Sequence, residues 1–512
     1  MGYTITPVAS NYSFKNVHGN YEKPFGFDVR LYNDAPDNTI ANYNNTTSSI
    51  HALLQEAKDK QVRLRACGRL WSLSEVPYVQ DMCVFQYHKD NDANGKAVPS
   101  MKIKWFLQEL ALEDPMNKDT YLFTQTGNYI KDLNDHLKDK GRSLMTSGAS
   151  NGQTIAGAIG TGVHGSSINV GSIQDTVFGL HIITGPNPQD SIYLEAEDAP
   201  IANAAFAQSI NAQHIRDNKL FKAALVGLGA FGYVHGVLVK TEKAFLLQNY
   251  IKKVTIEDVY SFMSSMTVKN NGLNVTGMDP DKLFHMKFYI NQYDYNDNVR
   301  AEIIYKIPDT ARIGPPSYLE YNKDITLTMA KSLATVFPFL IKGIINKQLP
   351  KDGESEEGSL GEIFTDTTNL RDGQFSIAIA TDVSDGRAML EAILEAADNH
   401  KKIPSTFSLR FVKKSKATMA FTKYNMNCLF GIDGVGTGKT MELVEKLSPI
   451  LDSKNIPHTW HWGKVNVMDS DFVKAAYGQS RVDWINARMQ IFNDPIMAQI
   501  FTNDYIHHRG LS

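Results

Sequence analysis

Six glycines lie in the eighteen residues from Gly148 to Gly165, and no other feature of the sequence constrains the fold as strongly. An average usage of about 7% would place one or two glycines there. Glycine lets the backbone approach a ligand closely and leaves N–H groups free to bind an anion. Composition alone gives equal weight to a ligand-binding loop and to a tightly packed turn, so the neighbouring motifs have to decide.

Within this region, "GTGVHG" (Gly160–Gly165) matches the G-x-G-x-x-G pattern of Rossmann dinucleotide-binding loops. Such a loop must follow a strand, open a helix and precede an acidic residue by about 20 positions. The residues after Gly165 include Gly171 and carry no apolar stripe, so they predict no helix. The pattern recurs in "GLGAFG" (Gly227–Gly232), which runs into a predicted strand. Two matches in the wrong context argue against a Rossmann fold.

A third glycine-rich motif, "DGVGTGKT" (Asp433–Thr440), ends like a Walker A loop. Asp433 stands where that loop needs glycine, and its carboxylate would face phosphate oxygens. We therefore favour a turn between two structural segments. A P-loop nucleotide-binding protein is the alternative from a different functional class, and tight binding of ATP with magnesium would support it.

The length of the chain, its net charge and its cysteines limit the classes of protein to which it can belong. A chain of 512 residues predicts two or more lobes, and a net charge of −3 gives no bulk attraction to nucleic acid. The three cysteines, Cys67, Cys83 and Cys428, form no C-x-x-C pair, so neither a disulfide framework nor a metal site is predicted.

Targeting signals are weak in this sequence. The first fourteen residues lack the basic segment and apolar run of a signal peptide. The most apolar segment, "LATVFPFLI" at 333–341, is too short to span a bilayer, which needs roughly 20 apolar residues. We expect a cytoplasmic protein without integral membrane association.

Hydrophobic periodicity indicates an α+β chain. Thr46 and Thr47 can cap a helix with one apolar face, and a second such helix ends at Gly141. From about residue 246 onward, paired strands and helices predict a domain built on an antiparallel sheet. The polar segment 350–362 predicts a loop within that domain.

Several motifs, taken in order, resemble one family. The segment "TSGASNGQTIAGAIGTGVHGSS" (146–167) resembles the flavin-binding signature of FAD enzymes of the vanillyl-alcohol oxidase type, which have the p-cresol methylhydroxylase (PCMH) fold. Its "GAIGTGVHG" core is most similar to the aldonolactone and alditol oxidase branch. Other segments that resemble this family are "VRLRACGRLWSLS" (62–74), "FKAALVGLGAFGYVHGVLVK" (221–240), "HWGK" (461–464) and "FNDPIMAQIFTNDY" (492–505).

The resemblance implies a two-domain PCMH-type fold of the α+β class. An FAD-binding domain of two α+β subdomains would cover residues 1–245. A substrate (cap) domain, also α+β with an antiparallel sheet, would cover 246–465, and the segment 466–512 would return to the FAD-binding domain.

The same resemblance implies the cofactor contacts. The pyrophosphate of FAD would lie on backbone N–H groups of the loop Cys67, Gly68, Arg69, Leu70, Trp71 and Ser72. Further contacts are implied for Ser147, Gly148, Ala149, Ser150, Gly157, Thr161, Gly162, His164, Gly165 and Ser166, with Val234 near the adenine. His164 would then be a part of the cofactor loop rather than a catalytic base.

One departure concerns the flavin linkage. Many relatives carry a histidine in the pyrophosphate loop that bonds covalently to the flavin, and the matching position here is Trp71. No cysteine is present in "TSGASNGQ" for a second bond. We therefore expect FAD to be held non-covalently, unless a histidine of the substrate domain provides a different linkage.

The resemblance also implies catalytic residues. Lys464 in "HWGK" resembles an active-site lysine, and a cation there would stabilise negative charge on the reduced flavin. On the predicted strand "STFSLRFVKKSKA" (405–417), Arg410 matches an active-site arginine, whereas Ser408 stands where the branch has a glutamate. Alternation puts Ser408 and Arg410 on one face of that strand. The resemblance therefore provides no carboxylate at position 408.

Two further positions are candidates. Ser150, with Ala149, matches the place beside the flavin that governs oxygen access. His461 is either a base or a packed partner of Trp462.

The function implied is that of an FAD-dependent oxidoreductase. It would oxidise a CH–OH group of a small-molecule alcohol by hydride transfer to flavin N5, with O₂ as acceptor giving H₂O₂. A polyol or an aldonolactone fits the "HWGK" branch. The missing glutamate and the apolar segment near 333–341 also permit a larger apolar alcohol such as a sterol, and a dehydrogenase with another acceptor is a further alternative.

Overall fold

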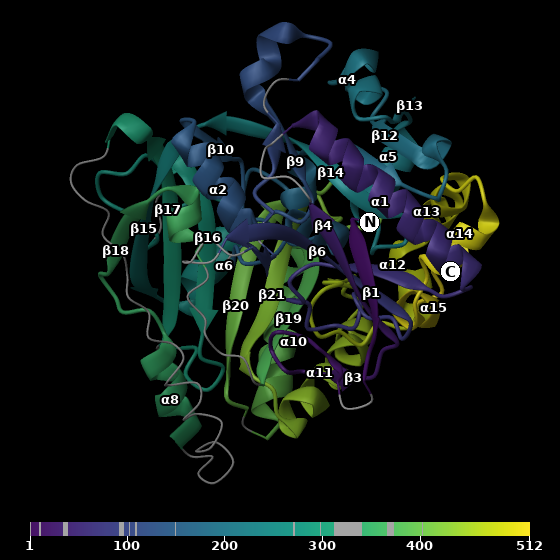
Figure 1. The fold of residues 1–512 in the computed structure, drawn as a ribbon. Helices are drawn as coiled ribbons and strands as arrows, with labels where there is room; N and C mark the ends of the chain where they lie inside the picture. The colour runs from purple at the N-terminus through teal and green to yellow at the C-terminus, as the bar shows by residue number, and fades with distance from the viewer. Residues whose placement is uncertain are drawn as a thin grey trace.

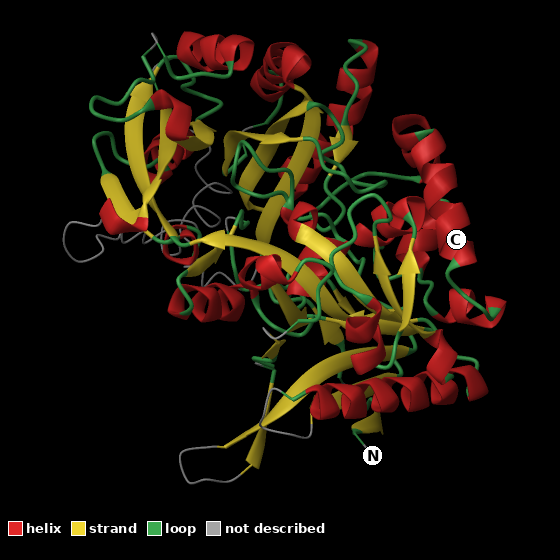
Figure 2. Ribbon diagram, turned by 90° about the horizontal axis from the view of Figure 1, so that it is seen from above, coloured by secondary structure: helices red, strands yellow, loops and turns green. Residues whose placement is uncertain are grey.

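The computed structural model describes residues 2–9, 12–33, 39–91, 97–101, 103–107, 110–148, 150–269, 272–296, 298–311, 340–365, 373–401 and 403–512. Helices and sheets occur throughout these residues, so the predicted α+β class is confirmed (Figure 1). Seen from above, the strands gather into separate groups with helices around them (Figure 2). Ala149 and the apolar residues 333–339 lie outside the described residues.

The N-terminal part contains a five-stranded sheet in the order β1-β4-β6-β5, with β7 paired to β6. Its strands are β1 (Tyr3–Pro7), β4 (Phe27–Asn33), β5 (Leu64–Cys67), β6 (Met82–Asn91) and β7 (Ala97–Ser100). β5 and β4 run parallel to β6 on either side of it. The loop after β5 therefore leaves the sheet at a strand's carboxyl end, where α/β proteins commonly bind ligands. A short hairpin, β2 (Phe14–Lys15) and β3 (Glu22–Lys23), lies outside this sheet.

Helix α1 (Ile40–Asp59) begins earlier than predicted. Its N-cap is Thr39, whose side chain accepts a hydrogen bond from the Asn42 N–H, whereas Thr46 and Thr47 lie inside the helix. Their hydroxyls donate to the carbonyls four residues back. The prediction was wrong because the polar run 44–49 separates the first turn of the helix from the apolar stripe that begins at Ile50.

A seven-stranded sheet follows, in the order β13-β12-β11-β14-β9-β8, with β10 paired to β14. Its strands are β8 (Phe106–Leu107), β9 (Tyr121–Gln125), β10 (Arg142–Leu144), β11 (Val177–Ile183), β12 (Ser191–Glu195), β13 (Gln213–Arg216) and β14 (Tyr233–Lys243). The helices between them are α2 (Ile130–Asp139), α3 (Ile155–Gly160), α4 (Ala204–Ser209) and α5 (Asn218–Leu225). As predicted, no α-helix begins directly after Gly165, and only a short 3-10 helix, Ile173–Thr176, precedes β11.

The third sheet has eight strands, in the order β18-β15-β17-β16-β20-β21-β19-β22, and every pairing is antiparallel. Its strands are β15 (Phe245–Val254), β16 (Leu283–Ile290), β17 (Val299–Pro308), β18 (Ser355–Gly358), β19 (Gln374–Asp382), β20 (Ser405–Lys413), β21 (Met426–Val435) and β22 (Thr459–Trp460). Its helices are α6 (Ile256–Ser265), α8 (Ile341–Gln348), α9 (Leu360–Ile363), α10 (Gly386–Asp398) and α11 (Gly438–Ser453).

The segment 350–362 differs from its prediction as a loop. Residues Ser355–Gly358 form the edge strand β18, and α9 follows directly. The polar composition of this segment is typical of a loop, so the strand was not predicted. In the structure Glu356 and Glu357 accept hydrogen bonds from amide side chains of β15.

The eight-stranded sheet has a helix-covered face and a polar face. Leu409 and Phe411 of β20 are fully buried, and the Phe411 ring packs 5.0 Å from the Phe262 ring of α6. Because side chains alternate along a strand, Ser408 and Arg410 point away from these helices. The opposite face of β20 therefore carries the polar residues that the sequence singled out.

The C-terminal helices pack against the N-terminal half. They are α12 (Ser470–Tyr477), α13 (Gln479–Gln490), α14 (Pro495–Ile500) and α15 (Asp504–His508). Helix α14 contacts α1, and α13 contacts α5, which places the yellow and purple ends of the chain side by side in Figure 1. Trp484 is buried, and its indole N–H donates to the Val226 carbonyl at 3.0 Å.

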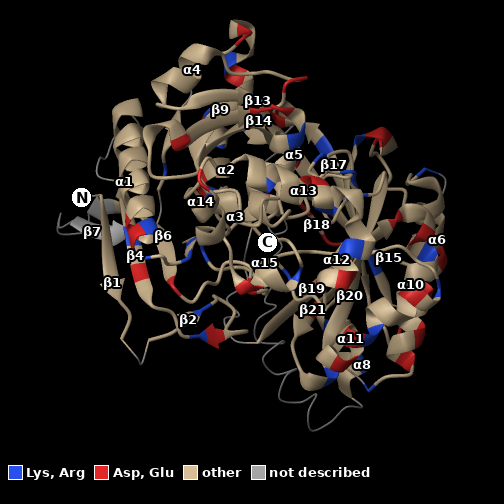
Figure 3. Cartoon of the chain, turned by 90° about the vertical axis from the view of Figure 1, so that its right-hand side faces the viewer, with Lys and Arg blue, Asp and Glu red and all other residues tan. Residues whose placement is uncertain are grey.

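Charged residues of both signs are spread over the structure, and the three cysteines are buried. Basic and acidic residues are interspersed over the elements seen in Figure 3, in keeping with the net charge of −3. The three cysteines are buried free thiols. Among the described residues, no helix is long and apolar enough to cross a membrane, and no cluster of three acidic, histidine or cysteine side chains could hold a metal ion.

Candidate active site

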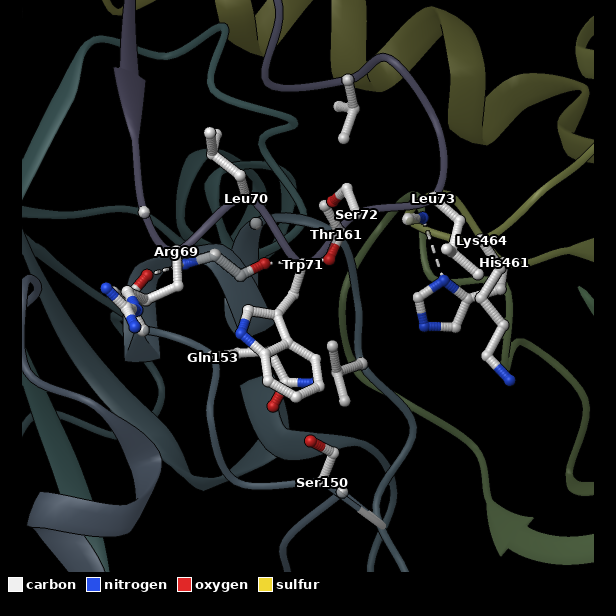
Figure 4. Close-up of a pocket in the computed structure, with 18 of the residues that line it drawn as sticks. Arg69, Leu70, Trp71, Ser72, Leu73, Ser150, Gln153, Thr161, His461 and Lys464 are labelled. Carbon is white, nitrogen blue, oxygen red and sulfur yellow. Dashed lines mark hydrogen bonds between the residues drawn. The ribbon is translucent and has the colours of Figure 1, made fainter. Parts of the chain in front are cut away.

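A cavity of about 740 Å³ lies between the glycine-rich segments of the N-terminal half and the polar face of the eight-stranded sheet. A volume of several hundred cubic ångströms is typical of sites for small molecules and cofactors. In Figure 4, Arg69 lies at one side of this cavity, Lys464 and His461 at the other, and Trp71 between them.

The structure brings most of the predicted site residues to this cavity. Those that line it are Cys67, Gly68, Arg69, Leu70, Trp71, Ser72, Gly148, Ser150, Gly157, Thr161, His164, Val234, Ser408, Arg410, His461 and Lys464. Four predicted residues do not line it: Ser147, Gly162, Gly165 and Ser166. Gly165 instead packs against Thr146, whose hydroxyl oxygen accepts a hydrogen bond from the Ser166 N–H at 2.9 Å. The turn at Gly165 and Ser166 therefore supports the residues that line the cavity without lining it.

The loop "CGRLWS" after β5 lies tightly against the start of α3. A Cβ at Gly68 would collide with the hydroxyl of Thr154, which is the N-cap of α3. Leu70 adopts φ 55°, in the left-handed region. The close approach explains why the loop needs glycine at this position.

Trp71 is packed on both sides. Its ring lies against Gly152, where a Cβ would collide with it, and meets the His18 ring edge-on at 5.2 Å. An indole lacks the basic ring nitrogen through which a histidine bonds to a cofactor methyl group, so the position that matches the linking histidine carries a packing side chain.

The second glycine motif, "GLGAFG", also lines the cavity. We rejected it as a Rossmann loop from its sequence and did not predict this position. Gly229 and Gly232 have φ values of 71° and 112°, which other residues rarely adopt. Beneath this loop lies Arg65, only 1% exposed, whose Nη1 donates to the Leu228 carbonyl at 2.8 Å. Its Nε and Nη2 have no hydrogen-bond partner among the described residues, and burial lowers the pKa of Arg65 to about 9.

The sheet side of the cavity carries three charged groups from separate elements. Arg410 lies on β20, Asp433 on β21, and Lys464 in the turn after β22. The Asp433 carboxylate is 3.6 Å from Arg410 Nη2 and 3.8 Å from Lys464 Nζ. Asp433 was not a predicted site residue, although the third glycine motif, "DGVGTGKT", begins with it.

Burial and pairing set the charges of this group. Burial opposes ionisation of Asp433, but Lys464 and then Arg410 outweigh it and hold the pKa of the carboxyl well below its usual range. Burial lowers the pKa of Lys464 to about 8, against the opposing effect of Asp433. At neutral pH the cluster therefore has two cations and one anion.

Two histidines flank these charges and are neutral. Burial lowers the pKa of His461 to about 3, and burial together with Arg410 and Lys464 lowers the pKa of His164 well below its ordinary value. His164 Nε2 lies 3.3 Å from Arg410 Nη1 and accepts from it, and His461 Nδ1 accepts the Gly463 N–H at 2.9 Å. The His461 ring also packs 4.7 Å from the Phe421 ring, so a structural partner accounts for it.

The motif "DGVGTGKT" forms the predicted turn between a strand and a helix, β21 and α11. Thr437 caps α11 and accepts the Thr440 N–H at 3.1 Å. Gly434 has φ 157°, and a Cβ there would meet the Pro404 carbonyl. Asp433 faces the cations of the cavity instead of a phosphate site on α11.

Comparisons with known proteins agree with this geometry. Residues 110–187 match the model of an FAD binding domain. L-gulonolactone oxidase 3 of Arabidopsis thaliana is 29% identical over 140 residues, which cover 26% of this chain and 22% of the relative. A putative D-arabinono-1,4-lactone oxidase of Neurospora crassa is 33% identical over 123 residues, 24% of this chain and 18% of the relative. The match thus spans about a fifth of the length of these relatives.

Solved structures share the whole fold. A solvent-stable cholesterol oxidase superposes with a TM-score of 0.69 at 12% identity, covering 98% of this chain and 97% of that chain. Cholesterol oxidase from B. sterolicum superposes with a TM-score of 0.66 at 10% identity, covering 99% and 97%. Such low identity establishes the fold alone.

The fold and the matching domain define an FAD-binding protein with a sheet-rich second part. The chain therefore carries an FAD binding domain and has the fold of these cholesterol oxidases, in agreement with the PCMH-type resemblance of its motifs, and FAD is its cofactor.

The cavity fits FAD on three observations. Its floor is glycine backbone, where added Cβ atoms would collide with neighbours. Buried donors that line it lack partners among the described residues: Arg65 Nε and Nη2, Ser150 Oγ and Arg410 Nε. Cations at its sheet side suit a ring system that gains negative charge when it is reduced.

Proposed function

We propose that this chain is an FAD-dependent oxidase that oxidises a CH–OH group of a small polar alcohol and passes the electrons to O₂, giving H₂O₂. The observation that carries the proposal is the cavity itself, which places a glycine-lined floor opposite Arg410, Asp433 and Lys464. Bound FAD supplies the oxidant, because flavins accept hydride at N5.

Two parts of the chain would share this work. Residues 1–245 and 466–512 would hold FAD through the loop at Cys67–Ser72, the glycine-rich wall and Val234. Residues 246–465 would cover the substrate. Arg65 would be an additional cofactor ligand, because its unpartnered donors are buried beside the cavity.

Arg410 and Lys464 would stabilise negative charge that develops during the reaction. Fixed cations in a site that excludes water stabilise such charge far more than they would in bulk solvent. Ser408 would orient Asp433, to which its hydroxyl donates at 3.1 Å.

The lining of the substrate side favours a polyol or an aldonolactone over a sterol. Polar side chains from several elements line it: Lys287, Tyr289, Lys351, Glu354, Gln374 and Thr406. An apolar alcohol would have to desolvate these groups without satisfying them, which costs free energy for each.

An anaerobic bleaching experiment tests the function. The purified yellow protein is mixed without oxygen with glycerol, xylitol, sorbitol, an aldonolactone and a solubilised sterol, and the flavin absorbance is followed. We expect the polyols or the lactone to bleach it and air to restore it with release of H₂O₂. Bleaching without recovery in air would indicate a dehydrogenase, and a protein that no alcohol bleaches would contradict the proposal.

Because Trp71 replaces the linking residue, FAD should be released by denaturation. Precipitation with trichloroacetic acid is expected to leave a colourless pellet and a yellow supernatant whose flavin runs with authentic FAD on chromatography. Colour that stays with the pellet would indicate a covalent bond from another residue.

A further inference from the structure

We propose that Asp433 is the substrate-binding carboxylate of this site, and that it accepts a hydrogen bond from the alcohol hydroxyl in place of the glutamate that the family resemblance places at position 408. This inference rests on the proposed function and names the residue that recognises the substrate.

Strand register places Asp433 on the polar face of the sheet. β20 and β21 are antiparallel neighbours, with Ser408 opposite Gly431 and Thr406 opposite Asp433. Directly opposed residues point to the same face, so Asp433 projects on the side of Ser408 and Arg410. Gly431 has no side chain, so the carboxylate approaches Ser408 diagonally across the open position.

The neighbouring hydroxyls orient the carboxylate. Ser376 Oγ donates to Asp433 Oδ1 at 2.6 Å, and Ser408 Oγ donates to Oδ2 at 3.1 Å. Each carboxylate oxygen can accept two hydrogen bonds. The two cations stand at 3.6 and 3.8 Å, beyond hydrogen-bond length, so each oxygen keeps a lone pair for another donor.

Other side chains that contact Arg410 or Lys464 are poor acceptors for an alcohol. Arg410 and Lys464 themselves only donate when they are charged. The free lone pair of the neutral His164 ring is taken by Arg410, and that of His461 by the Gly463 N–H. Within this charged cluster, Asp433 is therefore the group equipped to receive the hydroxyl proton of a bound alcohol.

Exposure and charge agree with such a role. The Asp433 side chain lines the cavity and is 38% exposed there, whereas Arg410 is 11% exposed. The cations keep Asp433 ionised, so it is an acceptor only. An alcohol offers a hydroxyl donor and its carbonyl product does not, so this carboxylate favours binding of the substrate over the product.

Dead-end binding to reduced enzyme tests the inference. The holoenzyme is reduced with dithionite under nitrogen, so that it cannot oxidise an alcohol, and xylitol is titrated by calorimetry. Asp433→Asn is expected to raise the xylitol dissociation constant about 10- to 100-fold, the usual loss for a hydrogen bond to a charged group. Its FAD affinity should stay within a few-fold of wild type. Asp382→Asn, at the end of neighbouring β19, is the matched control and should bind xylitol normally.

A relocated carboxylate provides the second variant. Ser408→Glu with Asp433→Ser moves the acid to the adjacent strand, where Gly431 leaves room opposite it. We expect this double variant to bind xylitol at least about tenfold more tightly than Asp433→Ser alone. If Asp433→Asn does not fold, this comparison tests the role of the carboxylate, and equal affinities would overturn the inference.

The outcomes separate the two proposals. If wild type is bleached by polyols and binds xylitol when reduced, but Asp433→Asn binds it equally well, Asp433 is only a structural ion-pair partner and this inference is overturned. If wild type neither binds xylitol nor is bleached by any alcohol, the proposed function fails as well.

Discussion

Replacing Lys464 with methionine should lower the rate of flavin reduction by the alcohol about 100- to 1,000-fold, the usual cost of removing one preorganised charge-stabilising group. Lys464 lies in a turn that contains the fully buried Trp462 and follows the fully buried Trp460 of β22. The turn is therefore held in place, and with it the position of the Lys464 ammonium group. Anaerobic stopped-flow absorbance measures the effect. Lys454→Met, on the surface at the end of α11, removes the same charge elsewhere and should leave the rate unchanged.

The pH profile gives an independent measure of Lys464. Its pKa is lowered to about 8, so the ammonium form is complete well below pH 8 and is lost as the pH rises through that value. If the cation is required, kcat/KM falls on the alkaline side with an apparent pKa near 8. Lys464→Arg, which stays charged, should remove this descending limb, whereas a limb that persists in that variant would assign it to another group.

Arg410→Met should slow flavin reduction by a similar factor, about 100-fold or more, while the FAD dissociation constant changes little. Arg410 contacts both His164 and Asp433, so its loss removes a cation and leaves a histidine lone pair unmatched. Stopped-flow reduction and fluorescence titration of the apoprotein with FAD separate the two effects.

The matched control is Arg387→Met, at an exposed position of α10, where among the described residues Arg387 pairs with Glu391 and lies over the Tyr260 ring. An unchanged reduction rate in Arg410→Met would mean that this arginine serves only the ion pair with Asp433. A parallel loss of FAD affinity would instead place it in the cofactor site.

Much of the fold could be predicted in segments where apolar residues recur regularly over many positions. Four strands of the eight-stranded sheet, β15, β16, β17 and β19, and helix α2 were found from apolar spacing alone. The start of α1 was missed because its first turn buries only Tyr43, and β18 was missed because its glutamates bond to a neighbouring strand. For β18 the deciding contacts are with a distant segment, which local patterns do not encode.

The sequence predicted the site residues that lie within local motifs and missed those whose role depends on contacts between distant segments. Residues within motifs, such as Trp71 and Lys464, were found, and the structure brings them to one cavity. Asp433 was missed because its link to Ser408 crosses from one strand to the next, 25 residues away in the chain. Arg65 was missed because an arginine on a strand resembles a surface residue until its burial is known.

The turn that carries Lys464 is tied to the cofactor loop on the other side of the cavity. The Leu73 N–H donates to the Gly463 carbonyl at 2.8 Å, and Ser74 Oγ donates to the Trp462 carbonyl at 2.6 Å. Tyr505 from the last helix donates to the same Trp462 carbonyl at 2.7 Å. These hydrogen bonds join the three segments into one physical unit, so a chimera that exchanges the substrate domain between relatives would have to carry the "HWGK" turn with the cofactor half.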